Sequence, residues 1–245
     1  DIHSTLSVTK SIFLDNKSNQ YAGAIAARFL CAIHIDNCSF VNNRANEQIG
    51  GILAYMNSTL SVTHSEFRNN TGGQSDGAVG VSKFSSAAIN YSWFYNNTAS
   101  KVAGGIKVEI HSLLIAHNCK FRGNNGGLIG GAIYAFNYSR ANISNCSFEN
   151  NKARQAAGGV GIGTKTALFV SNSEFKNNNG GVQAGAIAAK GNCTTVVNNC
   201  QFLHNTASIL AGGILNAKYS TVIVNNSALS NNNGGQFGGA ILVIE

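Results

Sequence analysis

The chain has 245 residues and a mass of 25.6 kDa, a length that suits one large domain or two small ones. Apolar residues make up 44% of it and charged residues only 11%, which excludes an intrinsically disordered chain, because there is apolar material to bury and little charge to keep the chain expanded. No run approaches the roughly eighteen apolar residues of a transmembrane helix, so membrane insertion is not expected. The opening Asp1-Ile2-His3 has no Met and no targeting segment, and we expect a mature or trimmed product.

A unit of 27 residues recurs along the whole chain without insertion. Its marker is a Phe, replaced by Leu in the last copy, at Phe13, Phe40, Phe67, Phe94, Phe121, Phe148, Phe175, Phe202 and Leu229. Three residues after each marker there is Asn, at Asn16, Asn43, Asn70, Asn97, Asn124, Asn151, Asn178, Asn205 and Asn232. Ten residues after each marker there is Gly, and Ile or Val follows two residues later.

In chain order, each unit predicts short strands separated by turns. Apolar residues stand seven and five positions before the marker, at the marker, and twelve and fourteen positions after it, with Thr195 as an exception at the first of these positions. This alternation is typical of strands with one buried face. Asn-Asn, Asn-Gly and Gly-Gly clusters between them predict turns. A helical repeat would use Ala, Leu, Glu and Lys at spacings of three and four, whereas runs such as Thr-Val-Ile-Val at 221–224 are short and β-branched.

A strictly constant unit of short strands predicts an all-β parallel β-helix, or β-solenoid, of nine coils in a single domain, 1–245. Equal coils place each residue above its counterpart about 4.8 Å away, so that like residues form ladders and nine coils give a rod of roughly 40 Å. An inward Asn can hydrogen-bond to the Asn of the next coil and to the turn backbone, which would otherwise be unsatisfied. The nine Asn residues are therefore predicted to be structural.

A second period is superimposed on the first. The residue after the invariant Gly alternates between Ala and Gly, beginning with Ala24, Gly51 and Ala78. Copies with Ala there mostly carry Gly-Gly earlier in the loop, as at 126–127, whereas the other copies carry Ala, as at Ala99. The unit is thus a 54-residue pair of coils, and we expect alternating loop shapes that interlock along one edge.

The pattern Phe-x-x-Asn followed by Gly-Gly-Ala-Ile resembles the repeats of the polymorphic outer membrane proteins (Pmp). The match is closest at 121–124 (Phe-Arg-Gly-Asn) with 130–133 (Gly-Gly-Ala-Ile), and similar copies cover the whole chain. The resemblance implies a right-handed parallel β-helix on a cell surface, where members of that family are adhesins and autotransporter passengers.

Six Cys residues occupy only two columns, two and nine residues before the marker, that otherwise hold Ser or Thr. They are either small buried substitutes for Ser or partners in a disulfide. Cys119 and Cys146 are the disulfide candidate, because they share a column in adjacent coils and their expected Cα separation of about 4.8 Å lies in the disulfide range. No CxxC motif or His pair indicates a metal site, and no cofactor is expected.

Asn-x-Ser/Thr sequons are numerous, although a chain rich in Asn, Ser and Thr generates many by chance. Asn57, Asn137 and Asn192 lie near the turn that follows the Ile strand and are the glycosylation candidates expected to be best exposed. Asn69 and Asn96, each one residue before a ladder Asn, come next.

The net charge of +7 is scattered over many positions of the repeat, with one partial basic column of Arg68, Arg122 and Lys176. This column suits an acidic polysaccharide or lipid surface, and a solvated face is the alternative. Nucleic-acid binding is not expected, because we anticipate no exposed column that interleaves aromatic and basic residues.

An enzyme of the polysaccharide lyase or hydrolase kind needs clustered carboxylates, either as an acid–base pair or as Ca²⁺ ligands. The ten Asp and Glu residues are spread over coils and positions, and the nearest pair, Glu149 and Glu174, flanks the Phe column on opposite sides. The sequence therefore favours a non-enzymatic, secreted or cell-surface scaffold or adhesin. A polysaccharide-binding β-helix protein or a polysaccharide lyase or hydrolase is the alternative.

We also expect end-to-end self-association. The repeat runs in phase from Leu6 to Ile244 with no polar cap, and an open coil exposes apolar side chains and unpaired strand edges. A head-to-tail contact does not close and would grow a filament. A piece of a longer array is the alternative.

Overall fold

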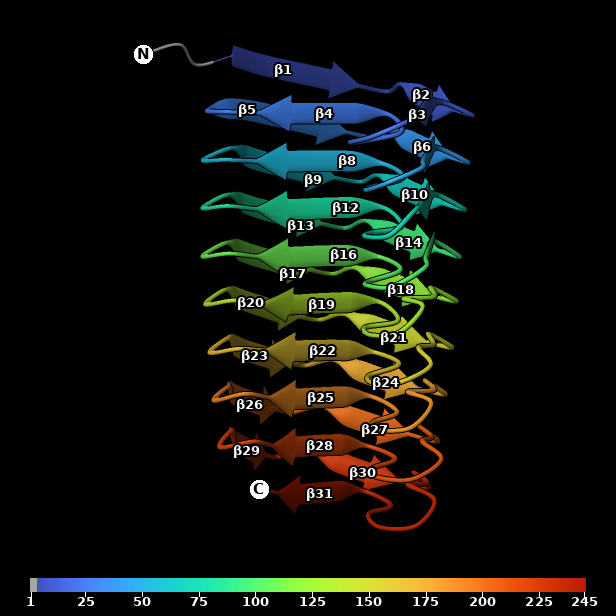
Figure 1. The fold of residues 1–245 in the computed structure, drawn as a ribbon, viewed down its shortest axis with the longest axis vertical. Coiled ribbons are helices and arrows are strands. Elements are labelled where there is room, and N and C mark those ends of the chain that lie inside the picture. Colours follow the sequence, from blue (N-terminus) through green and yellow to red (C-terminus); the bar gives the residue numbers. More distant parts are fainter. Residues whose placement is uncertain (1–3) are drawn as a thin grey trace.

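The computed structural model describes residues 4–245, and every regular element within this range is a β-strand. The chain winds in coils that stack one below another, and it runs leftward in the front sheet of Figure 1, returns rightward behind it and descends with each turn, which makes the winding right-handed. The all-β parallel solenoid that the 27-residue period predicts is confirmed. Residues 1–3 of the predicted domain lie outside the described residues. No helix in residues 4–245 is long and apolar enough to cross a membrane.

Three parallel sheets of nine strands each form the walls. Sheet 1, at the back of Figure 1, consists of β1 (Ser4–Thr9), β5 (Cys31–Asp36), β9 (Thr59–Thr63), β13 (Ser86–Asn90), β17 (Leu113–His117), β20 (Arg140–Ser144), β23 (Ala167–Ser171), β26 (Thr194–Asn198) and β29 (Thr221–Asn225). Sheet 2 carries the Phe markers and consists of β2 (Ile12–Leu14), β6 (Ser39–Val41), β10 (Glu66–Arg68), β14 (Trp93–Tyr95), β18 (Lys120–Arg122), β21 (Ser147–Glu149), β24 (Glu174–Lys176), β27 (Gln201–Leu203) and β30 (Ala228–Ser230). Sheet 3, at the front, consists of β4 (Ile25–Arg28), β8 (Ile52–Tyr55), β12 (Val79–Ser82), β16 (Ile106–Glu109), β19 (Ile133–Phe136), β22 (Val160–Gly163), β25 (Ile187–Lys190), β28 (Ile214–Ala217) and β31 (Ile241–Ile244). A short fourth sheet joins β3 (Lys17–Ser18), β7 (Arg44–Ala45), β11 (Thr71–Gly72) and β15 (Thr98–Ala99).

The register of the sheets places like residues in contact. Phe67 pairs with Phe40 on one side and with Phe94 on the other. From the first coil to the eighth, the Phe rings stack with centroids 4.6–4.9 Å apart. Aliphatic columns from sheets 1 and 3 close around this stack in one continuous core. The alternation of buried and outward residues that the sequence predicts is therefore the packing pattern of the solenoid.

The Asn ladder runs through the coils at the turn that follows sheet 2. Asn124 Oδ1 accepts both the backbone N–H and the Nδ2–H of Asn97, each at 3.0 Å. Asn124 Nδ2 donates to Asn151 Oδ1 at 3.0 Å and to the Phe94 carbonyl at 2.9 Å. The same bonds repeat along the column, so that each interior Asn satisfies its amide completely and ties together three coils. The predicted ladder is confirmed.

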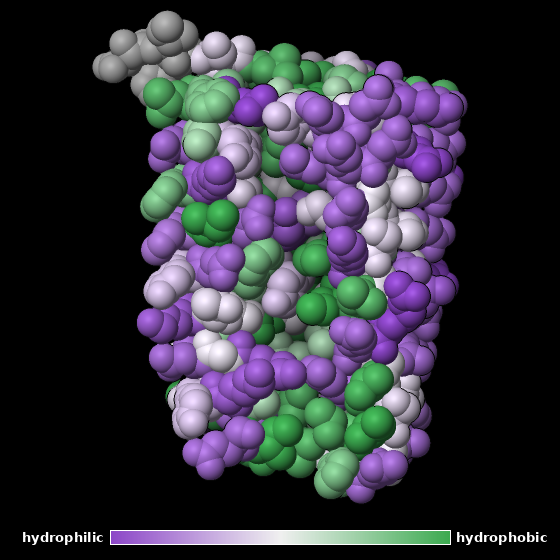
Figure 2. Space-filling model, viewed as in Figure 1, coloured by the Kyte–Doolittle hydropathy of each residue, from purple (hydrophilic) through white to green (hydrophobic). Residues whose placement is uncertain are grey.

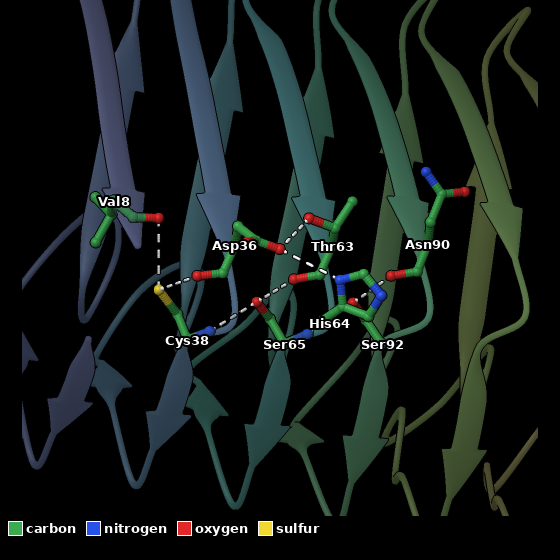
Figure 3. Close-up of polar contacts among 8 residues, drawn as sticks. All are labelled: Val8, Asp36, Cys38, Thr63, His64, Ser65, Asn90 and Ser92. Atoms are coloured by element: carbon green, nitrogen blue, oxygen red, sulfur yellow. Dashed lines mark hydrogen bonds and ion pairs between the residues drawn. The ribbon is translucent and has the colours of Figure 1, made fainter. Parts of the chain in front are cut away.

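The two small-residue columns form ladders of their own. Ser65 Oγ accepts the backbone N–H of Cys38 at 3.0 Å and donates to the Thr63 carbonyl at 2.7 Å, and the Ser65 N–H donates in turn to Ser92 Oγ at 3.1 Å (Figure 3). A small side chain with one donor and one acceptor is thus required at this corner. This requirement explains why only Ser, Thr and Cys occur in these columns.

Cysteines take the same role as the serines they replace. The Cys119 N–H donates to Cys146 Sγ at 3.4 Å, and Cys119 Sγ donates to the carbonyls of Ile89 and His117 at 3.3 Å. All six cysteines are free thiols in the structure, so the disulfide is not formed there. The adjacency of Cys119 and Cys146 agrees with the sequence-based expectation, and their pairing in an oxidising compartment stays a prediction.

Close packing accounts for the Gly half of the 54-residue alternation. A Cβ on Gly105 would lie only 2.6 Å from the backbone carbonyl oxygen of Ala132 in the next coil and 3.4 Å from the Phe121 ring. Only Gly therefore fits at this position. Nothing in the structure explains why the coils between carry Ala there. In the loop, Gly127 has a φ of +66°, and a side chain there would collide with the Ser100 carbonyl. The Gly-Gly loop at 126–127 thus packs closely against the preceding coil. The interlocking of alternate loops along one edge stays a prediction.

Loops pack against part of the outer face of sheet 3. In the lower coils, Ala184 and Ala211 of the loops that lead into this sheet form a small apolar cluster with Leu215 of β28. Figure 2 shows apolar side chains gathered at the lower end of this face. A smaller cluster around Ile49 and Leu53 covers the upper coils. These loops therefore add apolar packing outside the central core on this side of the solenoid.

Replacing Asn124 by Ala tests the ladder. We expect the free energy of unfolding to fall by about 1–3 kcal/mol, because Asn97 and the Phe94 carbonyl lose buried partners. Asn198→Ala, at an exposed end of β26, is the matched control and should change little. A chemical denaturation curve of Asn124→Ala that coincides with that of the wild type would contradict the ladder argument.

The cysteine column gives a second prediction. In protein from an oxidising compartment, non-reducing peptide mapping should find Cys119 linked to Cys146. The double variant Cys119→Ser, Cys146→Ser should fold normally, because Ser fills the same ladder position elsewhere in this column. Two free thiols in the oxidised protein would favour the Ser-like role alone.

Candidate functional site

The outer face of sheet 2 carries an open group of aromatic and basic side chains in the third to fifth coils. Phe67, Phe94 and Phe121 point into the core, so the residues on either side of each point outward. We call the outward set Arg68, Trp93, Tyr95, Lys120 and Arg122 the aromatic platform.

The strand register fixes the order of this platform. Tyr95 pairs with Arg68 above it and Arg122 below it, and Trp93 pairs with Lys120. The rings of Trp93 and Tyr95 lie 6.3 Å apart between centroids and are tilted by 35°. Trp93, the only Trp of the chain, is 46% exposed. Neighbouring strands lie about 4.8 Å apart, so the platform extends over about 10 Å.

Two carboxylates border the basic groups. Arg68 Nε lies 3.5 Å from Glu66 Oε1, and Arg122 Nε lies 3.6 Å from Glu149 Oε2. Exposed ion pairs of this kind contribute only about 0–1 kcal/mol to the free energy of unfolding, so the two guanidinium groups remain available to bind a ligand. Partial burial, followed by the nearby charge of Glu66, raises the pKa of Tyr95 above its ordinary value of 10.0. The platform therefore combines two aromatic rings with three basic groups, and two carboxylates lie at its border.

This arrangement corrects one expectation from the sequence. Arg68 and Arg122 are exposed, and the half-buried Tyr95 lies between them, so aromatic and basic residues do alternate in this column. The basic residues recur every second coil and are therefore visible in the sequence, whereas an aromatic residue occurs only once in this column, at Tyr95, and gives no periodic signal. Lys176, the third basic residue, lies two coils further down and outside the platform.

A groove adjoins the platform at the corner between sheets 1 and 2. We call it the corner groove; its upper part has a volume of about 280 Å³ and includes His64, Glu66, Tyr91 and Trp93 in its walls. The His64 and Tyr91 rings stack with centroids 5.3 Å apart. The floor is the small-residue column seen in Figure 3, and a wider groove of about 540 Å³ lies at the same corner in the lower coils.

Asp36 anchors the upper end of this groove. Its Oδ1 accepts a hydrogen bond from Thr63 Oγ1 at 2.6 Å and lies 3.3 Å from His64 Nδ1 (Figure 3). These hydrogen bonds, first from Thr63 and then from His64, hold the pKa of Asp36 below its ordinary value of 3.8. Asp36 therefore stays ionised and orients the His64 ring against Tyr91.

The predicted sequons lie at the turns. Asn57, Asn69, Asn96 and Asn192 are exposed and Asn137 is half-buried. All five have a left-handed backbone, with φ between 53° and 59°, a conformation that Asn tolerates better than most residues. Backbone geometry alone thus explains why Asn is frequent there, and glycosylation of these residues stays a prediction.

The expectation that acidic residues are dispersed is wrong at one place. Asp76 and Glu109 meet at Lys107 on the outer face of sheet 3, although they belong to different coils. The loop before β12 carries Asp76 across the sheet, and the path of a loop cannot be read from the repeat columns. Among residues 4–245, no group of three or more His, Cys, Asp or Glu side chains is arranged to hold a metal ion.

Changing Thr63 tests the geometry of the groove. In Thr63→Val the pKa of Asp36 should rise toward 3.8, because its strongest hydrogen bond is lost. Thr59→Val, in the same strand, is the control and should leave the Asp36 pKa unchanged. Carbon-detected NMR titration measures both values, and an unchanged pKa in Thr63→Val would refute this assignment.

A family model for right-handed β-helix regions matches residues 117–244. No curated protein and no solved structure matches the chain.

Proposed function

Because the chain belongs to the right-handed β-helix family, which includes both enzymes and non-enzymes, we propose a function from its own surface: an extracellular scaffold whose aromatic platform binds an acidic polysaccharide. The observation that carries the proposal is the position of Trp93 and Tyr95 among Arg68, Lys120 and Arg122 on an open sheet face.

The chemistry of the platform suits a charged sugar chain. Aromatic faces contact the apolar C–H faces of sugar rings, and Arg or Lys pairs with carboxylate or sulfate groups. A flat parallel sheet holds these groups at fixed spacing without loop rearrangement, which reduces the entropy lost on binding. An extended polymer can lie across the strands and continue into the corner groove beside Trp93.

Hydroxyl groups distinguish a polysaccharide from single-stranded nucleic acid at the bordering carboxylates. Glu66 and Glu149 lie beside the two Arg residues and would repel phosphate groups and sugar acid groups alike. Each sugar ring carries several hydroxyl groups that can donate hydrogen bonds to these carboxylates, whereas a nucleotide carries few. Nucleic-acid binding is the outcome against which the proposal is tested.

A location outside the cell and a non-enzymatic, adhesive role are part of the same proposal. They are supported by the resemblance to the Pmp repeats and by the predicted sequons. The repeat also has no inserted loop of the kind that usually carries a catalytic site. End-to-end association of subunits stays a prediction.

Trp93→Ala tests the proposal directly. We expect affinity for polygalacturonate to fall by about tenfold or more, because truncation of a central aromatic contact commonly costs over 1 kcal/mol. Arg68→Ala with Arg122→Ala should weaken binding and reduce its sensitivity to salt. Isothermal titration or affinity electrophoresis measures both effects.

Phe237→Ala is the matched control, because Phe237 is an exposed aromatic residue in a loop outside sheet 2. Neutral dextran and single-stranded DNA are the comparison ligands, and weaker binding of both is expected. Unchanged binding of polygalacturonate by Trp93→Ala, or preferential binding of DNA, would overturn the proposal.

A further inference from the structure

A charged cluster interrupts the apolar cover of sheet 3 between the third and fourth coils. Lys107 and Glu109 project outward from β16, because their neighbours Ile106 and Val108 belong to the core. Asp76, in the loop that leads into β12, folds over the sheet toward them and is fully buried. Strand β12 itself contributes Gly80, which pairs with Lys107 in the register.

The contacts within the cluster centre on the Lys107 amine. Its Nζ lies 2.9 Å from Glu109 Oε1, 2.6 Å from Ser75 Oγ and 3.7 Å from Asp76 Oδ2. Ser75 Oγ also donates to Asp76 Oδ1 at 3.0 Å, and Ser82 Oγ donates to Glu109 Oε1 at 3.0 Å. The amine is therefore held between two carboxyl groups, and its own side chain is only 11% exposed.

The two oxygens of Asp76 differ in their surroundings. Oδ1 accepts a hydrogen bond, whereas Oδ2 is buried and has no hydrogen-bond partner among the described residues. Burial raises the pKa of Asp76 from 3.8 to about 7, so that a substantial fraction is the neutral acid near neutral pH. Burial by itself would lower the pKa of Lys107, but the carboxylates of Asp76 and Glu109 raise it. A buried carboxylate and a buried ammonium group lose their hydration, and their mutual attraction can fail to offset the free energy of this desolvation.

We propose that Lys107 and Asp76 condense to form an intramolecular amide bond that joins the third and fourth coils. Glu109 first takes a proton from the Lys107 ammonium group, and the neutral Nζ attacks Asp76 Cγ. The new Nζ–Cγ bond replaces the Cγ–Oδ2 bond. Oδ2 leaves as water, with one proton from the carboxylic acid and one from the amine, and the third amine proton stays on the amide nitrogen. Glu109 then returns its proton to solvent, and no oxidant or reductant is needed.

The surroundings favour each part of this step. Glu109 lies within hydrogen-bond distance of the proton that it removes, as general acid–base catalysis requires. Oδ2, the oxygen without a partner, is the leaving atom, whereas Oδ1 keeps its bond to Ser75 and becomes the amide oxygen. Burial excludes water that would oppose condensation, and both reactants are already held together by the fold.

Gly80 provides the space for this arrangement. A Cβ at this position would lie 2.7 Å from Asp76 Oδ2 and would also collide with the Ile49 side chain. The amide would link the loop at residue 76 to the strand at residue 107 and would hold two coils together when the rod is pulled along its axis. This consequence is independent of polysaccharide binding.

Intact mass spectrometry of the chain from a bacterial host tests the proposal. The wild-type mass should be lower than the sequence mass by one water molecule, and peptide mapping should find the Asp76 and Lys107 peptides joined, with no tryptic cleavage after Lys107. Glu109→Gln should retain both reacting residues but recover the full mass. A wild-type chain at full mass after prolonged incubation at neutral pH would overturn the proposal.

Two further variants separate the bond from other causes of the same mass. A cyclic imide at Asp76-Gly77 also loses one water, but it would persist in Lys107→Arg and would leave the peptides separate; that result would refute the cross-link. Lys101→Arg, at an exposed lysine in the same coil as Lys107, is the control and should keep the loss of water. Circular dichroism verifies that each variant is folded, and the wild-type mass decides the question even if a variant is not.

Discussion

The hydrogen bonds of the Asn ladder are the constraint on which the other features depend. Each interior Asn uses its whole amide to connect its own coil with the coils before and after it, at a turn where backbone groups would otherwise be buried without partners. A coil one residue longer or shorter would displace its Asn from the column. The constant 27-residue period is therefore a condition for satisfying these groups, and the Phe stack and the Ser and Cys ladders follow from the same register.

The same register also determines what the surface can present. Outward side chains stand in rows about 4.8 Å apart on a rigid sheet, so a few substitutions within the repeat are enough to build a binding face. Trp93 and Tyr95 depart from the repeat at outward positions, where the core does not restrict the choice of residue. The residues that recur in every coil determine the fold, and the outward residues that vary between coils are available for binding.

That division explains what the sequence could and could not reveal. Recurrence identifies the strands, the inward columns and the Asn ladder, because the same residue or the same kind of residue recurs at these positions in nearly every copy. The aromatic platform rests on residues such as Trp93 that occur once, and the signal that could have identified it was an aromatic pair flanked in the same columns by basic residues. The cluster of Asp76, Lys107 and Glu109 cannot be predicted from the repeat columns, because it joins a loop residue to strand residues of the next coil.

Hydrogen exchange at the ladder amides tests the central claim most directly. The backbone N–H groups of Asn97, Asn124 and Asn151 lie outside the strands but donate to the next Asn side chain, so they should exchange as slowly as the strand amide of Phe94. Val182, an exposed loop residue whose N–H has no hydrogen-bond acceptor among the described residues, provides the fast reference. Ladder amides that exchange at the rate of Val182 would contradict the view that the Asn column holds the coils together.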